Sequence, residues 1–192
     1  MTQILLILDE SQSMTDIQQG IIDSVNSFIK SQKELKEDSG SETTFTFLKF
    51  NQDVYTILSN VDLNSVRDLT KETYSPSGRT ALFDAMGWGL LELNVNLNEK
   101  VIVVIVTDGQ DNSSVIFDKK EIFDLVSRRK QQGWNFFYLS SDIDTFKQGE
   151  DLGLLSSSAT TLNIQVKKEQ IPLIICQTCS NNIKQFRSFK TN

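Results

Sequence analysis

The sequence contains no histidine and only two cysteines in 192 residues. Without histidine, the chain cannot form Ser–His or Cys–His nucleophilic pairs, nor a histidine-ligated zinc or iron site. Cys176 and Cys179 form a lone C-x-x-C, and zinc would need two further soft ligands. The motif falls inside a late helical pattern rather than after an early strand, so we interpret its cysteines as ordinary helix residues and not as a redox pair.

Long apolar runs and an excess of basic charge are also lacking. No run approaches the ~18 residues of a membrane-spanning helix. Met1-Thr2-Gln3 leads straight into Ile4–Leu8 without a basic flank or a small-residue cleavage site, which argues against a signal peptide. The 19 basic and 25 acidic residues give a net charge of −6, which disfavours binding to nucleic-acid phosphates. We therefore expect a cytoplasmic protein with no membrane or nucleic-acid partner.

Three apolar segments predict strands that are buried on both faces, as in a parallel sheet. Ile4–Leu8 and Val101–Val106 are uninterrupted apolar runs, and Trp134–Leu139 is mostly apolar. Two strand patterns, around Phe45–Phe47 and at Val54–Leu58, are separated by a short polar link and predict a hairpin. A short edge strand is expected at residues 162–166.

Helical periodicity separates these strands and sets the fold class. Apolar residues recur at helical spacing in residues 17–35, 80–93, from 118 onwards and from 172 onwards. The last of these places Ile175, Cys179, Ile183 and Phe186 on one face. Alternating strands and helices predict a single domain over residues 1–192, with an α/β doubly wound, mostly parallel sheet, one antiparallel hairpin strand and helices on both faces.

Two of the buried strands end in acidic residues. Ile4–Leu8 leads into Asp9, and Val101–Val106 leads into Thr107-Asp108. Ligands of open α/β sheets bind beyond the carboxyl ends of the strands, where the strand order reverses. If the two strands are neighbours, the carboxylates converge and repel each other. Neither has a lysine or arginine beside it in sequence, so a divalent cation is the simple way to stabilise the pair.

Hydroxyl groups complete the expected site. Ser11 and Ser13 follow Asp9 at alternate positions, which point the same way in an extended segment. Thr80 ends a loop that lies between the two acidic strands in sequence. The candidate ligands are thus all oxygen donors, which suit Mg²⁺, Mn²⁺ or Ca²⁺. They are Asp9, Ser11, Ser13, Thr80 and Asp108.

The motifs that carry these residues resemble those of von Willebrand factor A (vWA) domains. Residues 9–13 fit the D-x-S-x-S motif, Thr80 resembles the family's metal-binding threonine, and residues 107–109 resemble its T-D-G motif. Gln12 stands where many members have glycine, at a position between ligands. The segment Phe137–Asp144 resembles that of intracellular bacterial or phage-type members.

The resemblance implies a Rossmann-like fold and a metal-ion-dependent adhesion site (MIDAS). In such a site Asp9, Ser11, Ser13 and Thr80 contact the ion directly or nearly so, and Asp108 binds it directly or through water. An open coordination position then accepts an aspartate or glutamate side chain from a partner protein. The resemblance implies a binding domain and not an enzyme.

Other interpretations stay open at the level of sequence. A Mg²⁺-dependent phosphatase of the haloacid dehalogenase type needs a second aspartate where Ser11 stands. A receiver-like signalling domain needs a strand-end lysine where serines follow Leu139. A structural subunit of a larger, possibly viral, assembly is a further alternative. Asp9 and Asp108 could be simple caps, and we interpret Glu10, Asp111, Asp142 and Asp144 as ordinary solvated or loop residues.

Overall fold

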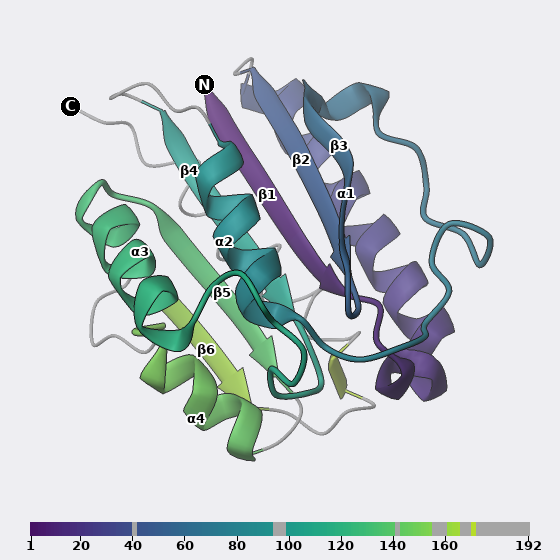
Figure 1. Ribbon diagram of the computed structural model, residues 1–192. Coiled ribbons are helices and arrows are strands. Elements are labelled where there is room, and N and C mark those ends of the chain that lie inside the picture. Colours follow the sequence, from purple (N-terminus) through teal and green to yellow (C-terminus); the bar gives the residue numbers. More distant parts are fainter. Residues whose placement is uncertain (40–41, 94–98, 141–142, 155–160, 166–169, 172–192) are drawn as a thin grey trace.

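The computed structural model describes residues 1–39, 42–93, 99–140, 143–154, 161–165 and 170–171 (Figure 1). Its strands are β1 (Thr2–Asp9), β2 (Thr43–Phe50), β3 (Val54–Asp62), β4 (Lys100–Val106), β5 (Asn135–Ser140) and β6 (Thr161–Gln165). Its α-helices are α1 (Gln18–Ser39), α2 (Leu82–Glu92), α3 (Lys119–Gln131) and α4 (Ile143–Asp151). Short 3₁₀ helices, η1 (Gln12–Ile17) and η2 (Leu63–Ser65), precede α1 and follow β3.

The strands form one sheet in the order β3-β2-β1-β4-β5-β6. β3 runs antiparallel to β2, and every other pair is parallel. This confirms the doubly wound α/β class and the edge hairpin expected from sequence. Since the chain moves from β1 to β2 on one side and later places β4 on the other, the strand order reverses between β1 and β4. That reversal point is where open α/β sheets bind ligands.

Alternate residues of the central strands enter two apolar layers. Ile4, Leu6 and Leu8 belong to the layer that includes α1. Leu5 and Ile7 belong to the opposite layer, which includes residues of α2 and α3. Figure 1 shows α1 on one face of the sheet and α2, α3 and α4 on the other. β1 and β4 are covered on both faces, which explains their uninterrupted apolar sequences.

The expected elements appear with small shifts of their ends. β5 begins one residue later than the predicted Trp134–Leu139, and β3 extends beyond Leu58 to Asp62. The predicted last helix from residue 172, with Cys176 and Cys179, lies outside the described residues. No helix in the described part of the chain combines the length and apolar character that a membrane span requires.

A capping box fixes the start of α3. The Asp118 carboxylate accepts a hydrogen bond from the Glu121 backbone N–H at 2.8 Å, and the Glu121 carboxylate accepts one from the Asp118 N–H at 2.9 Å. These bonds satisfy N–H groups that have no partner within the helix.

We expect Asp118→Ala to lower the free energy of unfolding by about 1 kcal/mol, because Asp118 is the N-cap. For a chain of this size that corresponds to a fall in Tm of about 2–4 °C, measured by calorimetry. Asp124→Ala on the same helix removes only an exposed pair with Lys120, and should lower the free energy of unfolding much less, because water and salt screen exposed ion pairs. Equal losses for the two variants would contradict the role of the cap.

Candidate metal centre

Asp9 stands at the carboxyl end of β1, and its side chain is fully buried. One carboxylate oxygen, Oδ1, accepts a hydrogen bond from the Ser11 backbone N–H at 2.7 Å. The other, Oδ2, accepts one from the Thr107 hydroxyl at 2.6 Å. Among the described residues, no lysine or arginine nitrogen lies within 4.0 Å of Asp9. The carboxylate is therefore oriented by neutral donors but not neutralised.

Burial raises the pKa of Asp9 from 3.8 to about 6, because the charged form loses its hydration. Hydrogen bonds from Thr107 and Ser11 lower the pKa and offset part of this effect, while the charge of Asp108 raises it further. A bound cation would act in the opposite direction and favour the ionised carboxylate.

A chain of hydrogen bonds links the first serines to the second acidic residue. The Ser11 and Ser13 hydroxyl oxygens lie 3.1 Å apart, and the Ser13 hydroxyl donates to Asp108 Oδ1 at 2.5 Å. The segment after β1 thus contacts the residues that follow β4, the strand that pairs with β1. Because the Ser11 N–H also donates to Asp9, these hydrogen bonds join four of the five residues proposed from sequence, namely Asp9, Ser11, Ser13 and Asp108.

Thr80 reaches the same place from the loop before α2. A Cβ atom on Gly109 would lie 3.5 Å from the Thr80 hydroxyl oxygen and 4.0 Å from the Ser13 hydroxyl oxygen, so both groups face Gly109. Asn112 fixes the Thr80 backbone, since its side chain accepts from the Thr80 N–H and its own N–H donates to the Thr80 carbonyl, both at 2.9 Å. The structure therefore gathers all five residues at one edge of the sheet.

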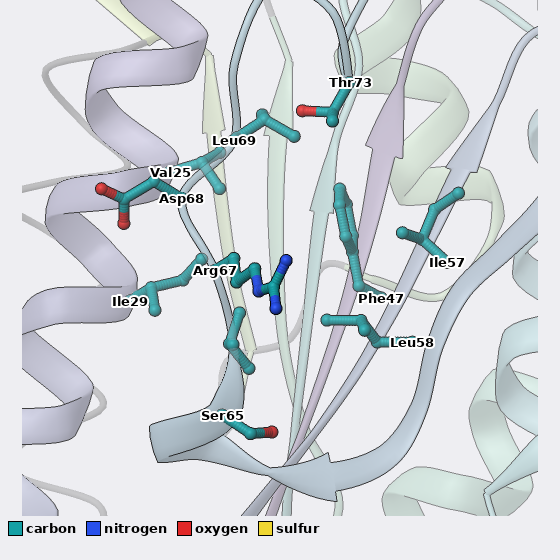
Figure 2. A pocket seen from close by; sticks show the side chains of 11 residues that line it. Val25, Ile29, Phe47, Ile57, Leu58, Ser65, Arg67, Asp68, Leu69 and Thr73 are labelled. Carbon is teal, nitrogen blue, oxygen red and sulfur yellow. The ribbon is translucent and has the colours of Figure 1, made fainter.

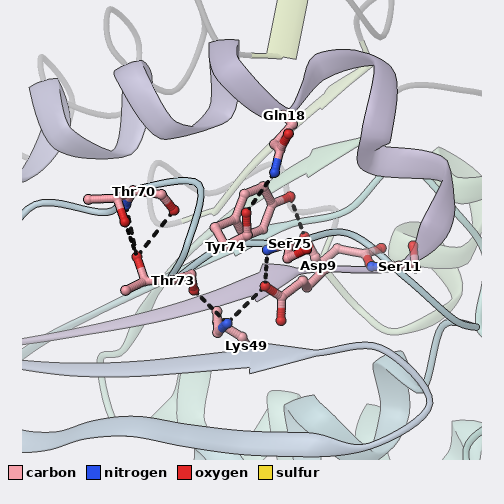
Figure 3. Close-up of polar contacts among 9 residues, drawn as sticks. Asp9, Ser11, Gln18, Lys49, Thr70, Thr73, Tyr74 and Ser75 are labelled. Carbon is pink, nitrogen blue, oxygen red and sulfur yellow. Dashed lines mark hydrogen bonds and ion pairs between the residues drawn. The ribbon is translucent and has the colours of Figure 1, made fainter.

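Glu10 corrects a prediction, because it is not solvated. Only 6% of its surface is exposed, and its carboxylate accepts hydrogen bonds from Lys49 Nζ at 2.8 Å and from the Ser75 N–H at 2.6 Å. Lys49 also donates to the Thr73 carbonyl at 2.6 Å (Figure 3). The pair ties the loop that leads to Thr80 onto the ends of β1 and β2.

Tyr74 supports the same loop from the α1 side. Its hydroxyl donates to the Asp9 carbonyl at 2.8 Å, and its carbonyl accepts from the Gln18 side chain at 2.8 Å (Figure 3). Burial raises the pKa of the Tyr74 hydroxyl well above its usual value, so this group stays protonated and keeps donating. Sequence analysis did not find Tyr74, since its role depends on a contact between distant segments.

Asp84 holds the loop that follows β4. Its buried carboxylate accepts hydrogen bonds from three successive backbone N–H groups, those of Val115, Ile116 and Phe117, at 2.8–3.0 Å. Sequence analysis did not identify Asp84 either, because an acidic residue in the first turn of a helix is common and its partners are distant in sequence.

The interpretation of Asp111 as solvated is also corrected, because this residue is half-buried and its carboxylate accepts hydrogen bonds from the Phe83 N–H at 3.1 Å and from the Ser114 hydroxyl. Asp144 is exposed, and Asp142 lies outside the described residues.

The donor set fits a hard divalent cation. All five candidate ligands offer oxygen, and two of them are carboxylates. No cluster of three or more His, Cys, Asp or Glu side chains is found in the described segments, so hydroxyls must supply the rest of any coordination shell. Such a mixture suits Mg²⁺, Mn²⁺ or Ca²⁺ better than zinc.

Comparison with known proteins decides the family. The profile of the von Willebrand factor type A domain matches residues 3–172. The chain belongs to this family. vWA domains commonly mediate metal-dependent protein–protein interactions. No curated protein matches the sequence.

Solved structures confirm the vWA fold at low sequence identity. The PilB minor pilin from Streptococcus sanguinis has a TM-score of 0.70 at 13% identity, covering 98% of this chain and 63% of that one. The SpRpn10 VWA domain has a TM-score of 0.63 at 12% sequence identity, and the match covers 95% of this chain and 94% of that one. Proximal thread matrix protein 1 from the mussel byssus, in a form with a zinc-occupied MIDAS motif, has a TM-score of 0.63 at 15% sequence identity. The match covers 96% of this chain, which spans only 45% of the length of the mussel protein.

The raised pKa of Asp9 predicts the pH dependence of stability in metal-free protein. The folded state holds the Asp9 proton more tightly than the unfolded state, whose pKa is 3.8. The free energy of unfolding should therefore fall as the pH rises from 4 to 7, by up to about 3 kcal/mol from this group. Chemical denaturation in EDTA, repeated at several pH values between 4 and 7, measures this fall in the free energy of unfolding.

Asp9→Asn should lack this component and be more stable than the wild type at pH 7 in EDTA. The side-chain amide that this substitution introduces can donate to the Thr107 hydroxyl, which then donates to the Gly109 carbonyl, 3.0 Å away in the wild type. Asp124→Asn, at an exposed position on α3, serves as the control. Parallel pH curves for wild type and Asp9→Asn would show that Asp9 is not the titrating group.

Proposed function

We propose that this vWA domain is a Mg²⁺-dependent protein-binding module with a MIDAS. Asp9, Ser11, Ser13, Thr80 and Asp108 would hold the ion, and Mn²⁺ or Ca²⁺ can replace it. An open position on the ion would accept an aspartate or glutamate carboxylate from a partner protein. We also propose that the domain acts in the cytoplasm, as the sequence led us to expect.

The observation that carries this proposal is the buried carboxylate of Asp9. Taking an unpaired carboxylate out of water costs several kcal/mol, and Asp9 has neutral donors but no basic side chain within 4.0 Å in the described structure. The positively charged side chain of Lys49, which lies nearby, forms its ion pair with Glu10 and not with Asp9. A divalent cation would supply the missing positive charge at the place where the second carboxylate and three hydroxyls also converge.

The composition of the shell supports binding of an external carboxylate rather than catalysis. Three of the five proposed ligands are neutral hydroxyls. With Asp108 bound through a water molecule, Asp9 would be the only carboxylate in direct contact with the ion, which would then keep a net positive charge and attract an anionic oxygen. Mg²⁺ prefers an octahedral oxygen shell, which five protein ligands do not fill. The domain's own contribution is to position these oxygens: the Glu10–Lys49 pair fixes the loop to Thr80, and Asn112 fixes its backbone.

Similar proteins agree with this proposal without deciding it. The mussel protein named above has a zinc-occupied MIDAS motif, and the pilus adhesin SpaC from Lactobacillus rhamnosus GG shares the fold at a TM-score of 0.64 and 14% identity. In the present chain the candidate ligands are all oxygens and histidine is absent, so we propose Mg²⁺ rather than zinc as the resident ion.

Isothermal titration of Mg²⁺ into metal-free protein tests the ion site. We expect saturable heat for the wild type and none for Asp9→Asn. Ser13→Ala should weaken Mg²⁺ binding by at least about tenfold, because even outer-shell partners of metal ligands contribute about 10–100-fold. Ser27→Ala, at an exposed site on α1, should bind as the wild type does. Equal heats for the wild type and Asp9→Asn would refute the site.

Capture of partner proteins tests the second half of the proposal. Immobilised wild-type domain in Mg²⁺ should retain a protein from a cell extract that EDTA releases and that Asp9→Asn fails to retain. Asp124→Asn should behave like the wild type, because it removes an exposed carboxylate outside the site. A protein retained equally in EDTA and by Asp9→Asn would mean that binding does not use the ion.

A further inference from the structure

We propose that the pocket between α1, the β2–β3 hairpin and residues 65–73 binds a small amphipathic carboxylate. The pocket has a volume of about 230 Å³, and its apolar wall is formed by Val25, Ile29, Phe47, Leu58, Val66 and Leu69 (Figure 2). None of the residues that line it belongs to the candidate metal centre. The proposal therefore concerns a second site and stands independently of the proposed function.

Hydrogen bonds from α1 hold one wall of the pocket in place. The Asn26 side chain donates to the Leu69 carbonyl at 2.9 Å and accepts from the Leu69 N–H at 2.7 Å. Lys33 donates to the Val66 carbonyl at 2.7 Å. The segment from Val66 to Leu69 is thus fastened to α1 at both of its ends.

An irregularity in the hairpin shapes the opposite wall. The pairing of β2 with β3 shifts register on either side of Phe47. Asn60 has a φ of 50°, in the left-handed region, and its N–H donates to the Thr46 hydroxyl at 3.0 Å. Bulges of this kind bend a strand and redirect its side chains, and they are common beside binding sites. Here the bend lies next to Leu58, on the side of the hairpin that lines the pocket.

Arg67 gives the pocket its charge. Its guanidinium extends across the pocket towards Phe47 (Figure 2). No carboxylate lies within 4.0 Å of it in the described residues. Asp68 also lines the pocket, but its carboxylate points towards α1 (Figure 2), where it shares an adjoining hollow with Lys30 and Lys33. The positive charge of Arg67 is therefore available to an anion in the pocket.

Size and charge together define the ligand class. A dry apolar cavity of about 150 Å³ holds a benzene molecule, so a pocket of about 230 Å³ accommodates an apolar body of about eight carbons. Arginine binds carboxylates through paired, charge-assisted hydrogen bonds. A medium-chain carboxylate would place its alkyl chain against Val25, Phe47 and Leu58, and its head group against Arg67.

Methyl NMR spectra of the metal-free protein, titrated with octanoate, test this proposal. We expect saturable shifts concentrated on the methyl groups of Val25, Ile29, Leu58, Val66 and Leu69. 1-Octanol, which has the same chain length without the charge, should bind about tenfold more weakly, because it cannot form the paired, charge-assisted hydrogen bonds that a carboxylate forms with arginine. No saturable shift with octanoate, or shifts scattered over the surface, would overturn the proposal.

Two variants separate the charge from the cavity. Arg67→Gln should weaken octanoate about tenfold and leave octanol unchanged, whereas Arg128→Gln, at an exposed site on α3, should change neither. Val25→Phe should abolish binding of both by filling the pocket. If that variant does not fold, Val25→Leu should still weaken both ligands. Octanoate binding that Arg67→Gln leaves intact would refute the role assigned to the arginine.

Discussion

The charge of one buried carboxylate constrains the architecture of this domain. Asp9 is the last residue of a strand that is covered on both faces, so its side chain is removed from water, and its pKa rises to about 6 as a result. Ser11 and Thr107 orient the carboxylate without neutralising it. A buried carboxylate of this kind destabilises the fold at neutral pH unless a cation binds it, and the hydroxyls of Ser11 and Ser13 form a hydrogen-bonded chain from its side to the second carboxylate, Asp108.

The segments around Asp9 are positioned by contacts that do not themselves supply ligands. Glu10 and Lys49 connect the ends of β1 and β2 to the loop before α2, and Tyr74 connects that loop to the Asp9 carbonyl. On the other side, Asp84 fixes the loop after β4 through three backbone N–H groups. Because each loop is anchored separately, hydroxyls from distant parts of the chain are held close together before any ion binds.

Much of this arrangement was predictable from local patterns, and the remainder depends on register. The apolar runs at residues 4–8 and 101–106 identify the two central strands, and Asp9 and Asp108 follow directly from their ends. Glu10 was predicted wrongly, because its partner Lys49 is brought alongside only by the pairing of Leu8 with Lys49 between β1 and β2. Asp84 was missed since its partners lie about 30 residues away in sequence. The pocket beside Arg67 lies next to a strand irregularity that no sequence pattern marks.

The position of a bound ion is the most direct test of the account. A crystal structure of the protein with Mn²⁺, located by its anomalous scattering, should show one strong peak among the Asp9, Ser11, Ser13, Thr80 and Asp108 side-chain oxygens. A partner or lattice carboxylate completing the shell would agree with the proposed function as well. A map with no peak there at millimolar Mn²⁺, or with the ion bound only at exposed acidic residues, would contradict the central claim.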